Sequence, residues 1–138
     1  MSTRANVIIQ SKKNDERIIL YRHLDGYPDG TLPTLNIFME WLKEGCIRAD
    51  VSQGGTWLIL IGAYEYGTFA IPETERGKNP DLEKMYPPTD WKAGAYEMTS
   101  CIHEDIEYLY TIDMDTKELT WKQVEYGEAA KLWKEGKL

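Results

Sequence analysis

The sequence ANVIIQSKKNDERIILYR, residues 5–22, contains two apolar runs separated by a short polar segment. β-Branched residues favour extended backbone, so we expect strands at residues 5–10 and 17–22. The polar residues between these runs include Asn14-Asp15, a pair that is typical of a turn. Two strands across a short turn predict an N-terminal β-hairpin.

The hairpin leads directly into YRHLDGYPDG, residues 21–30, which gathers one Arg, one His, two Asp and two Tyr on a frame of Gly and Pro. A permanent cation, a titratable imidazole, acceptors and aromatic faces in one short segment are suited to binding a polar ligand. The same residue types also form well-made turns that bind nothing. Both interpretations stay open from this stretch alone.

Two helices are predicted after this loop. Pro33 suits the first turn of a helix that follows Thr31 or Leu32, and Gly45 suits its end. The buried side of this helix is expected to carry four apolar residues at the spacing i, i+3, i+4, i+7: Leu35, Phe38, Met39 and Leu42.

The second helix is predicted between a cap at Ser52 and an end at Gly67. A buried strand over residues 56–61 is the alternative, but the length of the segment before Gly67 favours a helix. One side of this helix is expected to carry Trp57, Leu60, Ile61 and Tyr64.

The C-terminal third is predicted to form sheet. Strands are expected at residues 94–99, 106–112 and 119–124, the last two from a period-2 alternation on either side of a turn at residues 113–117. Residues 128–137 predict a short tail helix. Its apolar side would carry Ala129, Leu132 and Trp133.

Between the two halves, residues 68–88 hold four of the six prolines. A long irregular segment inside a compact domain is typical of a functional, interfacial or mobile loop. The order of elements predicts an α+β fold, with one domain over residues 1–138. Its antiparallel sheet would have two or three helices packed on one face.

Charge and composition narrow the possible functions. The net charge of −7 over 138 residues argues against nucleic-acid binding through phosphate contacts and against anionic membranes, but it leaves a basic protein partner open. Cys46 and Cys101 lack CxxC spacing, the N-terminus does not resemble a signal peptide, and no apolar run approaches the ~20 residues of a membrane span. We therefore expect a cytoplasmic protein, and the surplus of Tyr and Trp is compatible with a homo-oligomer.

The favoured site is a pocket between residues 21–30 and residues 90–96. The cations Arg22 and Lys92 are expected to bind anionic groups, the aromatic rings to stack on a planar group, and the other side chains to supply directional hydrogen bonds. The predicted ligand-binding set is Arg22, His23, Asp25, Tyr27, Trp91, Lys92 and Tyr96. This set predicts non-enzymatic binding of a small polar or nucleotide-like ligand, with no metal, cofactor or catalytic residue. The alternative is an Arg22–carboxylate pair at the surface, with Trp91 packed over the sheet edge.

Two other classes of function stay open. Nine acidic residues against two lysines in residues 97–128 suggest an acidic protein-interaction module that inhibits a basic host protein. His23 and His103 are each followed two residues later by an Asp, an arrangement that can orient a general base, so a hydrolase using either histidine is the third hypothesis.

Four stretches resemble a group of small phage and prophage proteins with no established activity. They are residues 2–9, the YRHLDGYPDG loop, Pro33-Thr34-Leu35 and residues 90–97 (DWKAGAYE). The resemblance implies a short phage accessory protein made in a bacterial cytoplasm. It further implies that such a protein counters host defence, by binding a host protein or by sequestering a nucleotide signal.

Overall fold

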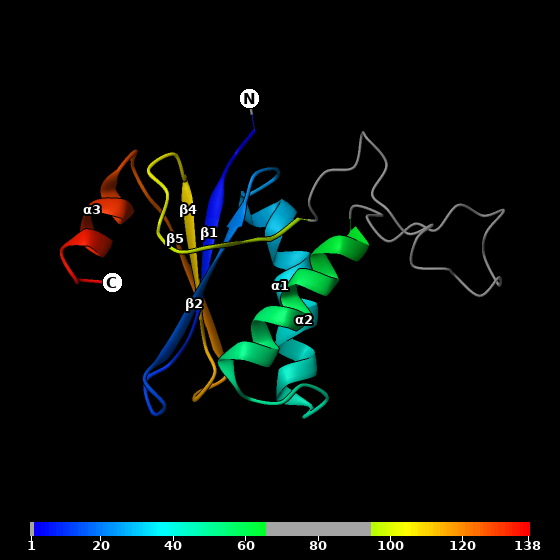
Figure 1. The fold of residues 1–138 in the computed structure, drawn as a ribbon. Coiled ribbons are helices and arrows are strands. Elements are labelled where there is room, and N and C mark those ends of the chain that lie inside the picture. Colours follow the sequence, from blue (N-terminus) through cyan, green and yellow to red (C-terminus); the bar gives the residue numbers. More distant parts are fainter. Residues whose placement is uncertain (1, 66–94) are drawn as a thin grey trace, which may run out of the picture.

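A five-stranded sheet lies between helices in the computed structural model, which describes residues 2–65 and 95–138 (Figure 1). The strands are β1 (Ala5–Ser11), β2 (Glu16–Arg22), β3 (Glu97–Thr99), β4 (Tyr108–Asp113) and β5 (Glu118–Gln123), in the spatial order β3-β2-β1-β4-β5. The helices are α1 (Pro28–Lys43), α2 (Val51–Glu65) and α3 (Glu128–Lys134). The predicted α+β class is confirmed.

The N-terminal hairpin is also confirmed, since β1 and β2 pair antiparallel along their full lengths. β1 is the central strand, and its apolar run is buried on both faces of the sheet. Val7 and Ile9 pack with α1 and α2, whereas Ile8 packs with α3. Burial on both faces explains why the run is continuously apolar rather than alternating.

One strand pair departs from the expected antiparallel sheet. β1 and β4 run parallel, with Val7 opposite Tyr110, while the other three pairs are antiparallel. The chain leaves β2 through the two long helices and β3, and then returns on the other side of β1. Its direction on return makes β4 parallel to β1.

Helices cover both faces of the sheet (Figure 1). The expected packing of two helices on one face is confirmed by α1 and α2, which bury Leu35, Phe38 and Leu58 against the sheet. The third helix does not join them, because Ala129 and Ala130 of α3 pack on the opposite face. The apolar pattern of a helix does not specify which face of a sheet it will cover.

α1 begins five residues earlier than expected. Pro28, not Pro33, occupies its first turn, where the missing proline N–H has no intrahelical acceptor in any case. The last three residues of the YRHLDGYPDG loop are therefore helical. The predicted buried side of α1 is confirmed, and its end is marked by Gly45 with φ +78°.

The helical interpretation of residues 51–65 is confirmed, but both its cap and its buried side were predicted wrongly. Asp50, not Ser52, caps α2, because its Oδ1 accepts the Gln53 N–H at 2.8 Å. Of the side predicted from the apolar spacing, only Ile61 is buried. The remaining members of that side, Trp57, Leu60 and Tyr64, are exposed.

α2 turns its glycines inward. Gly54, Gly55 and Gly62 lie on its buried side. A Cβ on Gly62 would lie 2.5 Å from Tyr96 Cδ2 and 3.1 Å from the Tyr96 backbone nitrogen. The glycines thus let α2 approach its neighbours closely, with Leu58 and Ile61 buried beside them, whereas Trp57, Leu60 and Tyr64 stay exposed.

The C-terminal strands and tail helix are confirmed with shorter bounds, because β3 covers only Glu97–Thr99 and α3 ends at Lys134. The predicted loop at residues 68–88 and the helix end at Gly67 lie outside the described residues. None of the helices in residues 2–65 and 95–138 is both long enough and apolar enough to cross a bilayer.

Candidate functional site

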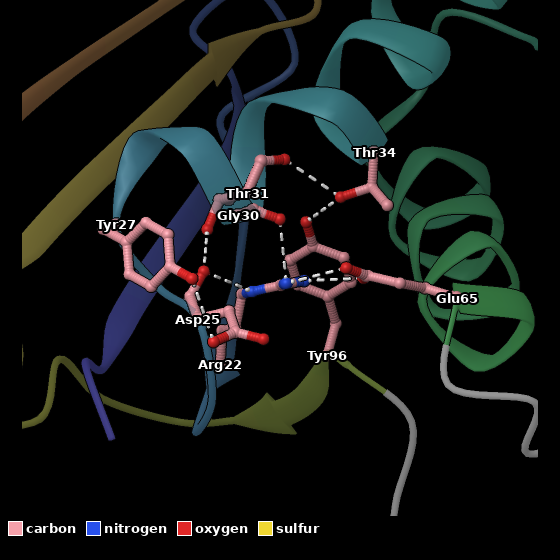
Figure 2. A network of polar contacts seen from close by, with 8 residues as sticks. All are labelled: Arg22, Asp25, Tyr27, Gly30, Thr31, Thr34, Glu65 and Tyr96. Atoms are coloured by element: carbon pink, nitrogen blue, oxygen red, sulfur yellow. Dashed lines mark hydrogen bonds and ion pairs between the residues drawn. The ribbon is translucent and has the colours of Figure 1, made fainter. Parts of the chain in front are cut away.

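Arg22, the last residue of β2, is completely buried on the side of the sheet that faces α1 and α2. Its guanidinium donates four hydrogen bonds within the described residues (Figure 2). Nη1 and Nη2 bind the two carboxylate oxygens of Glu65 at 2.8 and 2.9 Å. Nε binds the Asp25 carbonyl at 3.2 Å, and Nη2 also binds the Gly30 carbonyl at 3.0 Å. This is a bidentate, charge-assisted ion pair with additional backbone acceptors.

Glu65 was not among the predicted site residues, although the sequence contains a signal for it. It is the only charged residue in α2, and it lies in the last turn. A carboxylate at a helix C-terminus is repelled by the helix dipole, so its presence there calls for a compensating cation. Arg22 supplies that cation, and the Glu65 side chain is only 24% exposed.

The loop between β2 and α1 is shaped around Arg22. Asp25 has a left-handed backbone, with φ 55°, and its carbonyl accepts hydrogen bonds from both Arg22 Nε and Thr31 Oγ1. Gly30 is required at its position, because a Cβ there would lie 2.5 Å from the Asp25 carbonyl oxygen. Tyr27 is half-exposed, and its hydroxyl donates to Asp25 Oδ1. The adjacent Asp25 charge raises the pKa of Tyr27.

Tyr96 closes the other side of the network. Its ring centroid lies 5.1 Å from Arg22 Cζ, a cation–π contact. The hydroxyl of Thr34 donates to the Thr31 carbonyl, so the Tyr96 hydroxyl must donate to Thr34 Oγ1 (Figure 2). Burial raises the pKa of Tyr96 to about 12, which keeps this phenol in the neutral, donating form.

The structure brings four of the predicted residues together: Arg22, Asp25, Tyr27 and Tyr96. His23 lies away from them, because alternation along the strand sends Tyr21 and His23 to the opposite side of the sheet from Arg22. There His23 Nε2 lies 3.3 Å from Glu97 Oε2. Trp91 and Lys92 lie outside the described residues.

Both histidines contact the ring of Tyr21, His23 edge-on at 4.5 Å and His103 stacked at 3.9 Å between centroids. The aspartates of the two His-x-Asp triplets bind tyrosine hydroxyls instead: Asp25 binds Tyr27, and Asp105 binds Tyr21. His103 Nε2 pairs with a threonine hydroxyl, that of Thr99. Within the described parts of the chain, no group of three or more His, Cys, Asp or Glu is placed to hold a metal ion.

A second feature lies on the outward side of α1 and α2, and we call it the helix-pair patch. Trp57, Leu60 and Tyr64 of α2 follow the spacing i, i+3, i+7 and are 38%, 37% and 83% exposed. The ring of Trp57 meets that of Trp41 from α1 edge-on, at 6.1 Å between centroids. Ile37, one turn before Trp41, is 41% exposed. The patch is defined as Ile37, Trp41, Trp57, Leu60 and Tyr64.

Comparisons with protein-family models, with curated proteins and with solved structures found no match to this chain. Function is therefore inferred from the chain's own side chains. The Arg22 network can hold three segments of backbone together, and the same fork can bind a carboxylate or phosphate. The helix-pair patch can bury apolar surface of a partner.

Replacing Arg22 should strongly destabilise the folded protein, although Arg22 lies at the end of a strand beside a loop. We expect Arg22→Met to lower the free energy of unfolding by about 3 kcal/mol or more, because it leaves the Glu65 carboxylate without its cation. Glu65→Gln should cost about 1–3 kcal/mol, through loss of charge-assisted bonds. Urea denaturation followed by circular dichroism measures both effects.

Glu40→Gln on α1 is the matched control, since Glu40 is exposed and its change should stay within about 0.5 kcal/mol. The double variant Arg22→Met/Glu65→Leu should be more stable than Arg22→Met alone, because it leaves no unpaired charge. Equal, small losses for Glu65→Gln and Glu40→Gln would show that the ion pair does not support the fold.

Proposed function

We propose that this chain is a non-enzymatic protein-interaction module that binds another protein through the helix-pair patch. The observation that carries the proposal is the orientation of α2. A surface helix normally buries its large apolar residues and exposes polar ones. α2 departs from this pattern, because its buried side carries three glycines beside Leu58 and Ile61, while the large side chains of Trp57, Leu60 and Tyr64 are exposed.

The composition of the patch supports an interface. Trp and Tyr are enriched where proteins meet, and they contribute more binding free energy than most residues. The patch is also held in place before any partner arrives, because Glu65 anchors the end of α2 to Arg22 and Trp57 contacts Trp41. A surface that is already ordered loses less entropy on binding.

Charge supports the choice of partner. With its net charge of −7, the chain attracts a basic surface, and this attraction raises the rate of association with it. The partner we infer therefore presents apolar side chains within a positively charged surround. The resemblance to phage accessory proteins supports a bacterial host protein as this partner, whose activity the chain would inhibit.

The helix-pair patch should be required for recognition. We expect Leu60→Ala/Tyr64→Ala to weaken binding of a partner at least about tenfold, because Tyr is enriched among interface residues whose truncation costs about 2 kcal/mol or more, and Leu60 loses apolar contact beside it. Partners recovered from a bacterial lysate on the wild-type chain would be purified and their affinity for each variant measured by calorimetry.

Met98→Ala/Tyr126→Ala is the matched control, since Met98 and Tyr126 are 76% and 77% exposed and lie outside the patch. This control should retain wild-type affinity, and raising the salt concentration should weaken both complexes. A partner that binds the patch variant and the control equally well would contradict the proposal.

A second candidate function is the binding of a small anionic or nucleotide-like ligand at Arg22. One observation favours it: the guanidinium fork already holds a carboxylate in bidentate fashion, and that carboxylate is the partly exposed member of the pair. A ligand phosphate or carboxylate would take the place of Glu65, and Tyr27 would lie at the rim.

This second candidate predicts that a nucleotide or inorganic phosphate raises the melting temperature. Saturating ligand at about 100 times its Kd adds about 2.7 kcal/mol, or roughly 5 °C or more for a domain of this size. Sodium chloride of equal ionic strength is the control. A melting temperature that no nucleotide and no phosphate changes would remove this candidate and leave the protein-interaction proposal standing.

A further inference from the structure

β5 forms one edge of the sheet, where it pairs with β4 alone among the described strands. The N–H of Val124 donates to the Glu107 carbonyl of the neighbouring chain segment at 2.9 Å. Even-numbered residues of this strand therefore direct their main-chain groups toward β4. By the alternation of an antiparallel ladder, Leu119, Trp121 and Gln123 direct theirs outward.

The outward backbone groups of β5 are placed to pair with another strand. No backbone hydrogen bond within the described parts of the chain occupies the outward N–H and C=O groups of Leu119, Trp121 and Gln123. β5 contains no proline and is six residues long, twice the length of β3 at the opposite edge. Strands with such edges pair readily with another strand unless something covers them.

We propose that β5 pairs antiparallel with β5 of a second copy of this chain, about a twofold axis at Trp121. This register places Leu119 opposite Gln123 of the second copy, so every outward N–H and C=O finds a partner. A register shifted by two residues leaves part of the edge unpaired. Two sheets thereby become one continuous sheet.

The side chains fit the same axis. Trp121 is 47% exposed and would meet its own counterpart, while its inner side stays against the rings of Tyr108 and Tyr110 at 6.1 and 6.3 Å between centroids. Two exposed aromatic rings would leave water together. Aromatic pairs directly opposite each other are among the stabilising cross-strand pairs.

Charge complementarity selects a second copy rather than an unrelated strand. Glu118 and Lys122 are both exposed on the other face of β5. They lie four residues apart, about 13 Å along an extended strand, and so they are too distant to pair within one chain. In the dimer each Glu118 lies diagonally across from Lys122 of the second copy, within reach of a long side chain. The twofold axis generates two such pairs.

Charge reversal tests this arrangement by sedimentation velocity over a range of protein concentrations. Wild-type chain should dimerise. Glu118→Lys and Lys122→Glu should each raise the dimer Kd about tenfold, because each replaces two attractive pairs by two repulsive ones. Because both positions are exposed, the single variants should keep the wild-type circular dichroism spectrum and unfolding midpoint.

Two combinations make the test specific to the proposed axis. The double variant Glu118→Lys/Lys122→Glu should restore the wild-type Kd. An equimolar mixture of the two single variants should form a mixed dimer tighter than either variant alone, since both of its cross-strand pairs are attractive. A wild-type chain that stays monomeric throughout, or a double variant and mixture as weak as the single variants, would overturn the proposal. The helix-pair patch lies on other elements, so its role does not depend on this result.

Discussion

The ion pair between Arg22 and Glu65 is the interaction on which the arrangement of this chain depends. Arg22 ends the N-terminal hairpin, Glu65 ends α2, and the same guanidinium binds the Asp25 and Gly30 carbonyls at the start of α1. A buried charge is tolerated only when it is paired and hydrogen-bonded. The end of β2, the start of α1 and the distant end of α2 are therefore fixed relative to one another, and the YRHLDGYPDG loop closes around its own cation.

The ion pair between Arg22 and Glu65 helps to determine which side chains of α2 are exposed. With the end of α2 tied to Arg22 and Gly62 against Tyr96, the helix faces the sheet with the side that carries its three glycines, Leu58 and Ile61. Trp57 and Tyr64 are then held outward in a fixed position. The opposite end of the sheet offers a different surface, the open edge of β5, which is set by strand order rather than by Arg22. The proposed binding of a partner and the proposed self-association thus involve separate parts of the molecule.

The sequence predicted the positions of the helices and strands better than it predicted which side of each one is buried. The apolar runs of β1 and β2 were located nearly to the residue, and the periodic spacing in α1 predicted its buried side correctly although the helix begins five residues earlier. The buried side of α2 was predicted wrongly, because the helix has more apolar residues than one buried side can hold. The side with the glycines is buried instead, because it approaches Tyr96 closely. Of the predicted ligand-binding set, Arg22, Asp25, Tyr27 and Tyr96 lie together in the structure. Glu65 was missed because its position as the only charge in α2 indicates that it needs a cation but does not identify Arg22, 43 residues away, as that cation.

Amide hydrogen exchange, compared between the wild-type chain and Glu65→Gln, tests most directly whether this ion pair positions α2. Exchange should accelerate about tenfold or more in the last turn of α2 and the first turn of α1, since each 1.4 kcal/mol of local stability is worth a factor of ten. The central strands β1 and β4 should keep more of their protection. Unchanged exchange at the end of α2, or a uniform loss of protection over the whole molecule, would contradict the role assigned to Arg22 and Glu65.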